Sequence, residues 1–187
     1  MCKSSNFKCK WLPEINPCNN LSEYSKYEKE LYKIFKQMFF IDKVSFNGLP
    51  VKVKISPRYL EYETSFIHLT CKTESKNPED LNDREPDFRR AERLHWIKTI
   101  IEKYPCIEKC VECEGLLLYE EYYNGNLSRV RTKIFFPKEQ YIIILEKRKT
   151  YYELITAFYI ERGFEDRNIK KYYKKYDEYK RQGTPLF

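Results

Sequence analysis

Apolar and polar residues follow two different periods along the chain, and each period predicts its own kind of element. In three segments apolar residues recur every three to four positions, the spacing of an amphipathic helix. These predicted helices span residues 22–40, 82–104 and 166–182, with Ser22 as the expected N-cap of the first. Alternating or short apolar runs, which are typical of strands, cover residues 51–55, 64–71, 108–123, 127–136, 140–148 and 151–161.

Short connections join the last four predicted strands. Asn124-Gly125-Asn126 and Pro137-Lys138-Glu139 separate the first three, and Lys149-Thr150 precedes the last. Such links permit antiparallel hairpins but not parallel crossovers. We therefore expect an α+β fold, in which a four-stranded antiparallel meander packs against a preceding helix and further helices stand at both ends of the chain. Residues 1–42 would form an N-terminal arm and helix, 43–182 the main domain and 183–187 a tail.

The predicted helix 82–104 carries arginines on its core-facing stripe. The stripe includes Trp96 and continues toward the N-terminus through Arg93 and Arg89, with Asp87 placed to cap the first turn. An unpaired guanidinium beside a core costs on the order of several kcal/mol. Either Glu92 compensates these charges within the chain, or an anion such as a phosphate binds them from outside.

A second basic row lies on the predicted strand 127–136. Because side chains alternate between the two faces of a strand, Arg129, Arg131 and Lys133 share one face. Three cations in line repel one another unless solvent or a polyanion screens them. The row is therefore either an ordinary solvated face of the sheet or a surface that follows a phosphate backbone.

Composition narrows the choice of partners. Of the 187 residues 17% are aromatic, 17 of them tyrosine, and the formal net charge is +7. This basic excess suits a polyanionic partner. With only five glycines in the chain, a glycine-rich phosphate loop is not expected. No apolar run approaches the roughly 20 residues of a membrane span, so we expect a cytoplasmic protein.

Seven cysteines without an apparent export signal favour reduced thiols. Cys106, Cys110 and Cys113 include a C-x2-C spacing that occurs in zinc sites. A fourth ligand would have to be Cys9, Cys18 or a histidine. No second C-x2-C pair is present, so buried or idle thiols are the simpler interpretation, and we expect no metal.

Four stretches together resemble a known family. They are FIHLT (66–70), PDFRRAERLHW (86–96), RTKIFF (131–136) and YIIILEKRKTYYELITAFYI (141–160). In this order they resemble the phage-associated branch of the barnase, EndoU, colicin tRNase and RelE-like (BECR) nucleases. The resemblance covers about residues 43–181 and leaves 1–42 outside. His95 departs from the pattern, because a basic or neutral residue is expected there, and this leaves open which of the two histidines, His68 or His95, does chemistry.

The resemblance implies a BECR-type sheet fold and a small, metal-independent ribonuclease, often a toxin that cleaves tRNA or mRNA. The implied catalytic residues are His68 as base or acid, Arg89 and Arg93 as ligands of the phosphorane, Glu92 as a partner acid or base or an anchor for an arginine, Thr156 at a phosphate oxygen and Tyr159 at a base or a proton. RNA contacts would come from Arg129, Arg131, Lys133 and Trp96. Alternation places Thr156 and Tyr159 on opposite faces of their strand unless a bulge realigns them.

Two other classes of function fit the same residues. A non-catalytic RNA-binding protein would use the same basic row and aromatics. A protein-interaction factor would use the tyrosine-rich helices as its interface. A toxin would in addition be expected to have an acidic antitoxin or immunity protein. Incubation with RNA in EDTA separates the enzyme from both alternatives.

Overall fold

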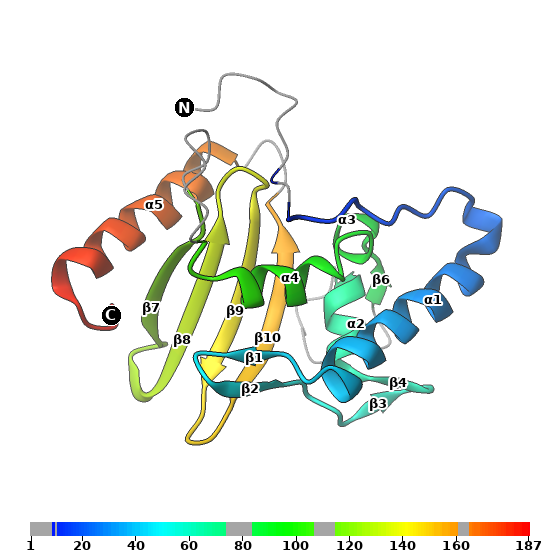
Figure 1. Ribbon diagram of the computed structural model, residues 1–187, viewed down its shortest axis with the longest axis horizontal. Helices are drawn as coiled ribbons and strands as arrows, with labels where there is room; N and C mark the ends of the chain where they lie inside the picture. Colours follow the sequence, from blue (N-terminus) through cyan, green and yellow to red (C-terminus); the bar gives the residue numbers. More distant parts are fainter. Residues whose placement is uncertain (1–8, 10, 74–83, 107–114, 161–164) are drawn as a thin grey trace.

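The chain folds around one mixed sheet of six strands (Figure 1). The computed structural model describes residues 9, 11–73, 84–106, 115–160 and 165–187. Across the sheet the strands follow the order β1-β2-β10-β9-β8-β7. Their bounds are Ser45–Phe46 (β1), Leu49–Lys52 (β2), Leu117–Tyr123 (β7), Asn126–Phe136 (β8), Tyr141–Lys147 (β9) and Tyr152–Tyr159 (β10). Within the described residues the α-helices are Tyr24–Lys36 (α1), Thr64–Thr70 (α2), Phe88–Ala91 (α3), Trp96–Lys103 (α4) and Glu165–Gln182 (α5). The predicted α+β class is confirmed.

The sheet is larger than predicted and is not purely antiparallel. β7, β8, β9 and β10 are antiparallel neighbours in chain order. β2, however, pairs with the start of β10 in parallel, and β1 pairs with β2. The sheet therefore has two more strands than predicted and one parallel pair, although the strands β7 to β10 pair antiparallel as expected. The first predicted strand of this group spans 108–123. Its residues 108–114 lie outside the described residues, and β7 begins at Leu117.

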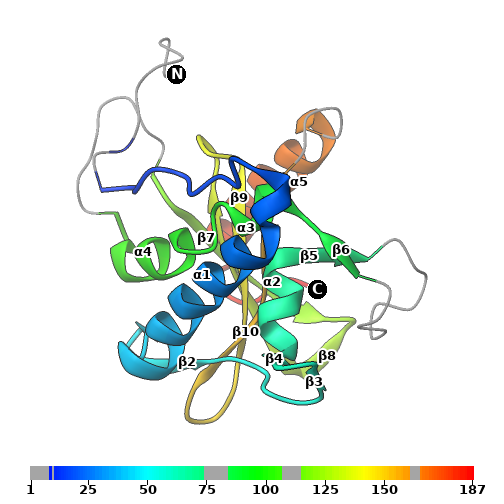
Figure 2. The same cartoon turned by 90° about the vertical axis from the view of Figure 1, so that its right-hand side faces the viewer.

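Two helical layers cover the two faces of the sheet (Figure 2). On one face, here called the α4 face, the sheet residues Ile134, Phe136, Tyr141, Ile143, Leu145 and Ala157 share a core with α1 and α4. On the other, the α5 face, Leu117, Phe135, Ile142 and Ile144 pack against Ile169 and three tyrosines of α5. Because β9 lies between two layers, its run YIIIL is apolar on both faces.

The N-terminal segment belongs to the same core as the sheet. Leu12, Leu31 and Phe35 are buried in the α4-face core, and Trp11 stacks on Phe136 with ring centroids 5.5 Å apart. None of the described helices is both long enough and apolar enough to cross a membrane. The domain boundary at residue 42 stays a prediction.

The first helix covers the predicted range but starts at a different cap. A 3-10 turn at Leu21–Glu23 precedes α1, and a π-helical turn at Gln37–Ile41 follows it. The side chain of Asn20 accepts a hydrogen bond from the Ser22 N–H at 3.0 Å. Asn20 therefore caps the 3-10 turn, while the N-cap of α1 itself is Glu23, which makes no side-chain cap bond. The assignment of this role to Ser22 is wrong.

Residues 64–70 form α2 and not the predicted strand. All residues of α2 except His68 are buried, so the segment has no polar face and its apolar pattern fits either period. The Thr70 hydroxyl donates to the Phe66 carbonyl at 2.9 Å, an i to i−4 bond that threonine makes inside a helix. α2 packs along the edge of β10 that β2 leaves unpaired.

The predicted helix 82–104 is divided in two. β5 (Cys71–Thr73) pairs with β6 (Arg84–Pro86) in a separate small sheet, as β3 (Arg58–Tyr59) does with β4 (Tyr62–Glu63), so regular helix starts only at α3. Between α3 and α4 the chain turns, because the N–H of Asn16 in the arm donates to the Glu92 carbonyl at 2.8 Å. A continuous helix would use this carbonyl to accept from Trp96, whose N–H donates to Arg93 instead.

The predicted cap at Asp87 is confirmed, and we expect it to stabilise the fold measurably. Its side chain accepts from the Arg90 N–H at 3.2 Å and pairs with the Arg90 guanidinium at 3.0 Å. Asp87→Ala should lower the free energy of unfolding by about 1 kcal/mol, the usual cost of a lost cap. Urea denaturation measures this loss. The matched control Glu85→Ala, at an exposed position nearby, should change stability by less than about 0.5 kcal/mol, and an equal loss in both variants would contradict the capping role.

Candidate functional site

A polar cleft of about 410 Å³ opens beside α2 and reaches the α5 face of the sheet. We call it the arginine cleft. Its lining residues are Lys54, Thr64, Ser65, His68, Tyr123, Arg129, Arg131, Arg148, Glu153, Leu154 and Ile155. The volume falls within the range of roughly 300–1,000 Å³ of small-molecule sites. The cleft therefore brings His68 together with two members of the predicted basic row, Arg129 and Arg131.

A single buried carboxylate organises the three arginines of the cleft. The Glu146 side chain is 0% exposed and accepts from Arg129 Nε and Nη2, both at 2.9 Å. Its Oε1 lies 2.8 Å from Arg148 Nη1, and its Oε2 lies 3.5 Å from Arg131 Nε. Because Glu146 stands directly opposite Arg131 in the β8–β9 pairing, strand register alone places the carboxylate among the cations.

The electrostatics of Glu146 favour its charged form. Burial acts to raise the pKa of this carboxyl, but the Arg129 hydrogen bond and the charges of Arg148 and Arg129 outweigh burial and hold the pKa below its ordinary value. In return, the bond to Glu146 raises the pKa of Arg129. The arginines are consequently fixed in place as cations.

Two further contacts orient the guanidinium groups. Arg148 Nε donates to Glu153 Oε2 at 3.0 Å, and this bond raises the pKa of Arg148. The ring of Tyr123 lies 3.5 Å from the Arg131 guanidinium carbon and 4.5 Å from that of Arg129, a cation–π arrangement. Held arginines lose less conformational freedom when an anion binds.

Charge in the cleft is positive overall. Four cations, Lys54 and the three arginines, face two carboxylates, the lining Glu153 and the buried Glu146. His68 is half-buried on α2 and adds an imidazole to the same lining. A cation-rich cleft with an imidazole and a carboxylate is suited to binding a phosphate and moving protons around it.

The third member of the basic row, Lys133, lies outside the cleft, beneath α5. It pairs with Glu121, which also pairs with Lys175 of α5. Burial lowers the pKa of Lys133, partly offset by Glu121. The row predicted on β8 is thus matched by Glu121 and Glu146 on the neighbouring strands and is not an unscreened line of cations.

Arg89, Glu92 and Arg93 form a separate group at the α3–α4 turn. Arg93 pairs with Glu92, donates to the Arg89 carbonyl at 3.0 Å, and lies 4.7 Å from the Tyr159 ring and 5.1 Å from Trp96. Arg89 is exposed, 5.3 Å from Tyr159. None of these three residues is among the described residues that line the arginine cleft. Of the two alternatives for these arginines, compensation within the chain therefore holds for Arg93, whose partner is Glu92.

The strand β10 places the two remaining predicted catalytic residues on different faces. A register shift between Leu154 and Thr156 sets Thr156 opposite Ile144, on the α5 face beside the cleft. Tyr159 stands opposite Tyr141, on the α4 face, and donates to Gln140 Oε1 at 2.8 Å. The bulge therefore does not bring Thr156 and Tyr159 into one site.

The N-terminal arm contacts Trp96, the first residue of α4, and His95, which precedes it. Trp96 is 2% exposed and donates from Nε1 to the Pro13 carbonyl at 3.0 Å, so its ring is closed to stacking on RNA. His95 Nε2 lies 2.7 Å from the Glu14 carbonyl. Of the two histidines, it is His68 that lines the cleft.

The cysteine question is answered only in part. Cys110 and Cys113 lie outside the described residues, while Cys9 and Cys71 are buried and Cys18 and Cys106 are half-buried. In the part of the chain that the structure describes, no three histidine, cysteine, aspartate or glutamate side chains gather as a metal site. The zinc alternative at 106–113 stays a prediction.

Sequence reasoning missed Lys54, Tyr123, Glu146, Arg148 and Glu153. Glu146 had a usable signal, since it is a lone carboxylate ending the apolar run of β9. Comparisons of the chain with protein-family models, with curated proteins and with solved structures found no match.

Proposed function

We propose that the chain is a metal-independent endoribonuclease whose reaction centre is the arginine cleft. The observation that carries the proposal is the meeting of His68 with Arg129, Arg131 and Arg148 in one cleft. Cleavage of RNA by its own 2′-hydroxyl needs a base, an acid and cations around the phosphorus, and all three kinds of group line this cleft.

The residues divide into roles by their chemistry. Glu153 offers a carboxylate oxygen to take the proton of the ribose 2′-hydroxyl, and His68, as imidazolium, offers a proton to the departing 5′-oxygen. Arg131 and its neighbours bind the non-bridging oxygens, where negative charge grows in the transition state. Glu146 touches no substrate and acts by positioning the arginines.

The reaction balances without an external reagent. The 2′-oxygen forms a bond to phosphorus while the bond from phosphorus to the 5′-oxygen breaks. One proton passes from the 2′-hydroxyl to Glu153, and another from His68 to the leaving oxygen. The products are a 2′,3′-cyclic phosphate and a free 5′-hydroxyl.

The resemblance to BECR nucleases supports the same proposal. His68 of FIHLT, Arg131 of RTKIFF and Glu146, Arg148 and Glu153 of YIIILEKRKTYYELITAFYI belong to stretches that carry the resemblance, and all five lie in or beneath the cleft. Under this proposal the fold is a variant of the BECR sheet with two added edge strands, and the substrate is tRNA or mRNA of a cell that the toxin enters.

Incubation of the purified chain with total tRNA and with mRNA in EDTA tests the proposal. We expect cleavage products that end in 2′,3′-cyclic phosphate. RNA that binds but remains intact would instead establish the second candidate, a non-catalytic RNA-binding protein, for which the internally paired arginines of the cleft would be a sufficient surface. RNA that is neither bound nor cleaved would overturn both candidate functions.

Arg131→Ala should lower kcat/KM for RNA cleavage by about 100-fold, the usual cost of removing one donor to a developing oxyanion. Of the three cleft arginines, Arg131 has the longest contact to Glu146, so Glu146 engages its guanidinium least. Single-turnover cleavage of a labelled oligonucleotide measures the change. Arg93→Ala tests the assignment made from the sequence, and a loss equal to that of Arg131→Ala would move the reaction centre to the α3–α4 turn.

A further inference from the structure

The outer side of α5 is a basic ridge. We define the α5 ridge by its exposed cations Arg167, Lys170, Lys171, Lys174, Lys180 and Arg181. Most of them follow i, i+3, i+4 and i+7 spacing and so share one helix face. The opposite face is anchored to the sheet by Tyr172, Tyr173 and Tyr176. From residue 167 to 181 the ridge spans about 21 Å, at the 1.5 Å rise of an α-helix.

No acidic residue interrupts the ridge between residues 167 and 175. Among the described side chains of α5, from residue 167 onward, the exposed carboxylate is Asp177, with the half-buried Glu178 beside it, and both stand in the second half of the helix. From 167 to 175 the described outward positions are basic. A cation row without interleaved acids binds a phosphate backbone better than a mixed surface does.

Paired side chains connect the ridge to the arginine cleft. Lys175, in the middle of α5, pairs with Glu121 on β7. Glu121 stands directly across from Arg131 in the β7–β8 pairing, and Arg131 lines the cleft. Cross-strand neighbours lie about 5 Å apart, so the middle of α5 is one side-chain contact away from the wall of the cleft.

From this adjacency we infer that the RNA substrate is a long strand that leaves the cleft past Tyr123 and runs along the α5 ridge. The inference rests on the proposed ribonuclease activity and adds to it a second binding surface for the RNA, outside the cleft. The cleft performs the chemistry, and the ridge supplies affinity that is independent of sequence and sensitive to salt.

Charge reversal of the ridge tests the inference. K170E/K171E/K174E should weaken binding of a non-cleavable 2′-O-methyl RNA of about 30 nucleotides, roughly twice the largest footprint of a single-strand-binding domain, by at least 10-fold in fluorescence anisotropy. The slope of log affinity against log salt should become shallower by about 2, at roughly 0.7 per lost phosphate contact. Cleavage of an unmodified trinucleotide should change less than about twofold, because the cleft is intact.

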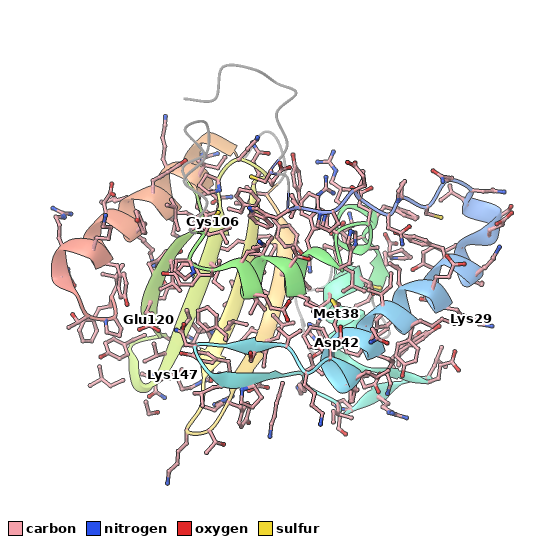
Figure 3. The ribbon with its side chains drawn as sticks, in the orientation of Figure 1. Lys29, Met38, Asp42, Cys106, Glu120 and Lys147 are labelled. Atoms are coloured by element: carbon pink, nitrogen blue, oxygen red, sulfur yellow. The ribbon has the colours of Figure 1, made fainter. Side chains whose placement is uncertain are left out.

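The matched control reverses three exposed lysines of α1, K26E/K29E/K33E, which equals the test variant in charge change. α1 lies on the opposite side of the molecule from α5, and Lys29 points outward there (Figure 3). The control should retain affinity within about twofold. Equal losses in the two variants would show a net-charge effect and overturn the ridge, as would unchanged affinity in the ridge variant. If only the ridge variant loses binding, and the wild type cleaves no RNA, the ridge is supported as an RNA-binding surface. The proposed ribonuclease activity is then overturned.

Discussion

His68→Ala should lower kcat/KM for RNA cleavage by roughly 100- to 10,000-fold, the range for removal of a general acid or base. The variant should fold, because α2 is held by its buried residues and by main-chain contacts. The Arg90 guanidinium, for example, donates to the backbone carbonyl of His68 at 3.2 Å, which alanine keeps. Alanine is also the strongest helix former.

Single-turnover cleavage in EDTA measures this loss, and urea denaturation confirms that the variant is folded. His95→Ala provides the comparison, because His95 contacts the arm at Glu14 and does not line the cleft. Its expected loss is less than about fivefold. A larger loss for His95→Ala than for His68→Ala would contradict the proposal, because it would assign the proton transfer to His95 and not to His68.

The predictable part of the fold is the part set by local pattern. The hairpins of β7 to β10 follow from alternation and from turns such as Asn124-Gly125, where both residues have positive φ, as a two-residue hairpin turn requires. The helix α5 follows from its tyrosine stripe. The hairpins are stabilised largely by contacts between neighbours in sequence, and the tyrosine stripe marks the face that α5 buries against the sheet, so the pattern was sufficient for both.

The errors occur where distant segments decide the structure. Residues 64–70 are buried on all sides but one, so their period is ambiguous until the edge of β10 is in place. The break in the predicted helix 82–104 depends on Asn16, about 75 residues upstream, which takes the Glu92 carbonyl. Tertiary contacts override local propensity in both cases.

The candidate site was predictable in one half only. The turn after β8 sets Phe136 opposite Tyr141, and counting outward from this pair places Arg131 opposite Glu146. Cross-strand counting could therefore have found the central ion pair. The approach of His68 could not be found in this way, because it depends on the packing of α2 against β10. The arginines expected to carry the site, Arg89 and Arg93, lie at the α3–α4 turn outside the arginine cleft, where Arg93 pairs with Glu92.

Glu146 links stability to the proposed function. Three guanidinium groups converge on one carboxylate, and without it they would repel one another across the cleft. The buried carboxylate stabilises the arrangement of the arginines, while Arg129 and Arg148 remain partly exposed to solvent. The cleft can then receive a phosphate without first reorganising.

Glu146→Gln should consequently lower the free energy of unfolding at pH 7 by about 2–4 kcal/mol. Breaking a buried ion pair costs about 3–5 kcal/mol, and the partial exposure of Arg129 and Arg148 screens part of that cost. Urea denaturation measures the loss. Glu102→Gln, an exposed carboxylate 3.7 Å from Lys98, is the matched control, with an expected change below about 0.5 kcal/mol.

The difference between wild type and Glu146→Gln should depend on pH in a defined direction. The pKa of Glu146 in the folded chain lies below the ordinary value of 4.5, so on acidification the unfolded chain takes up the proton first. The stabilisation by Glu146 is therefore complete above that value and is lost as the pH falls below it toward the folded pKa. We expect the two unfolding free energies to converge as the pH falls from about 4.5 toward the lowered pKa of Glu146 in the folded chain. A difference that stayed constant across that window, or grew, would show that Glu146 does not hold the arginines through its charge.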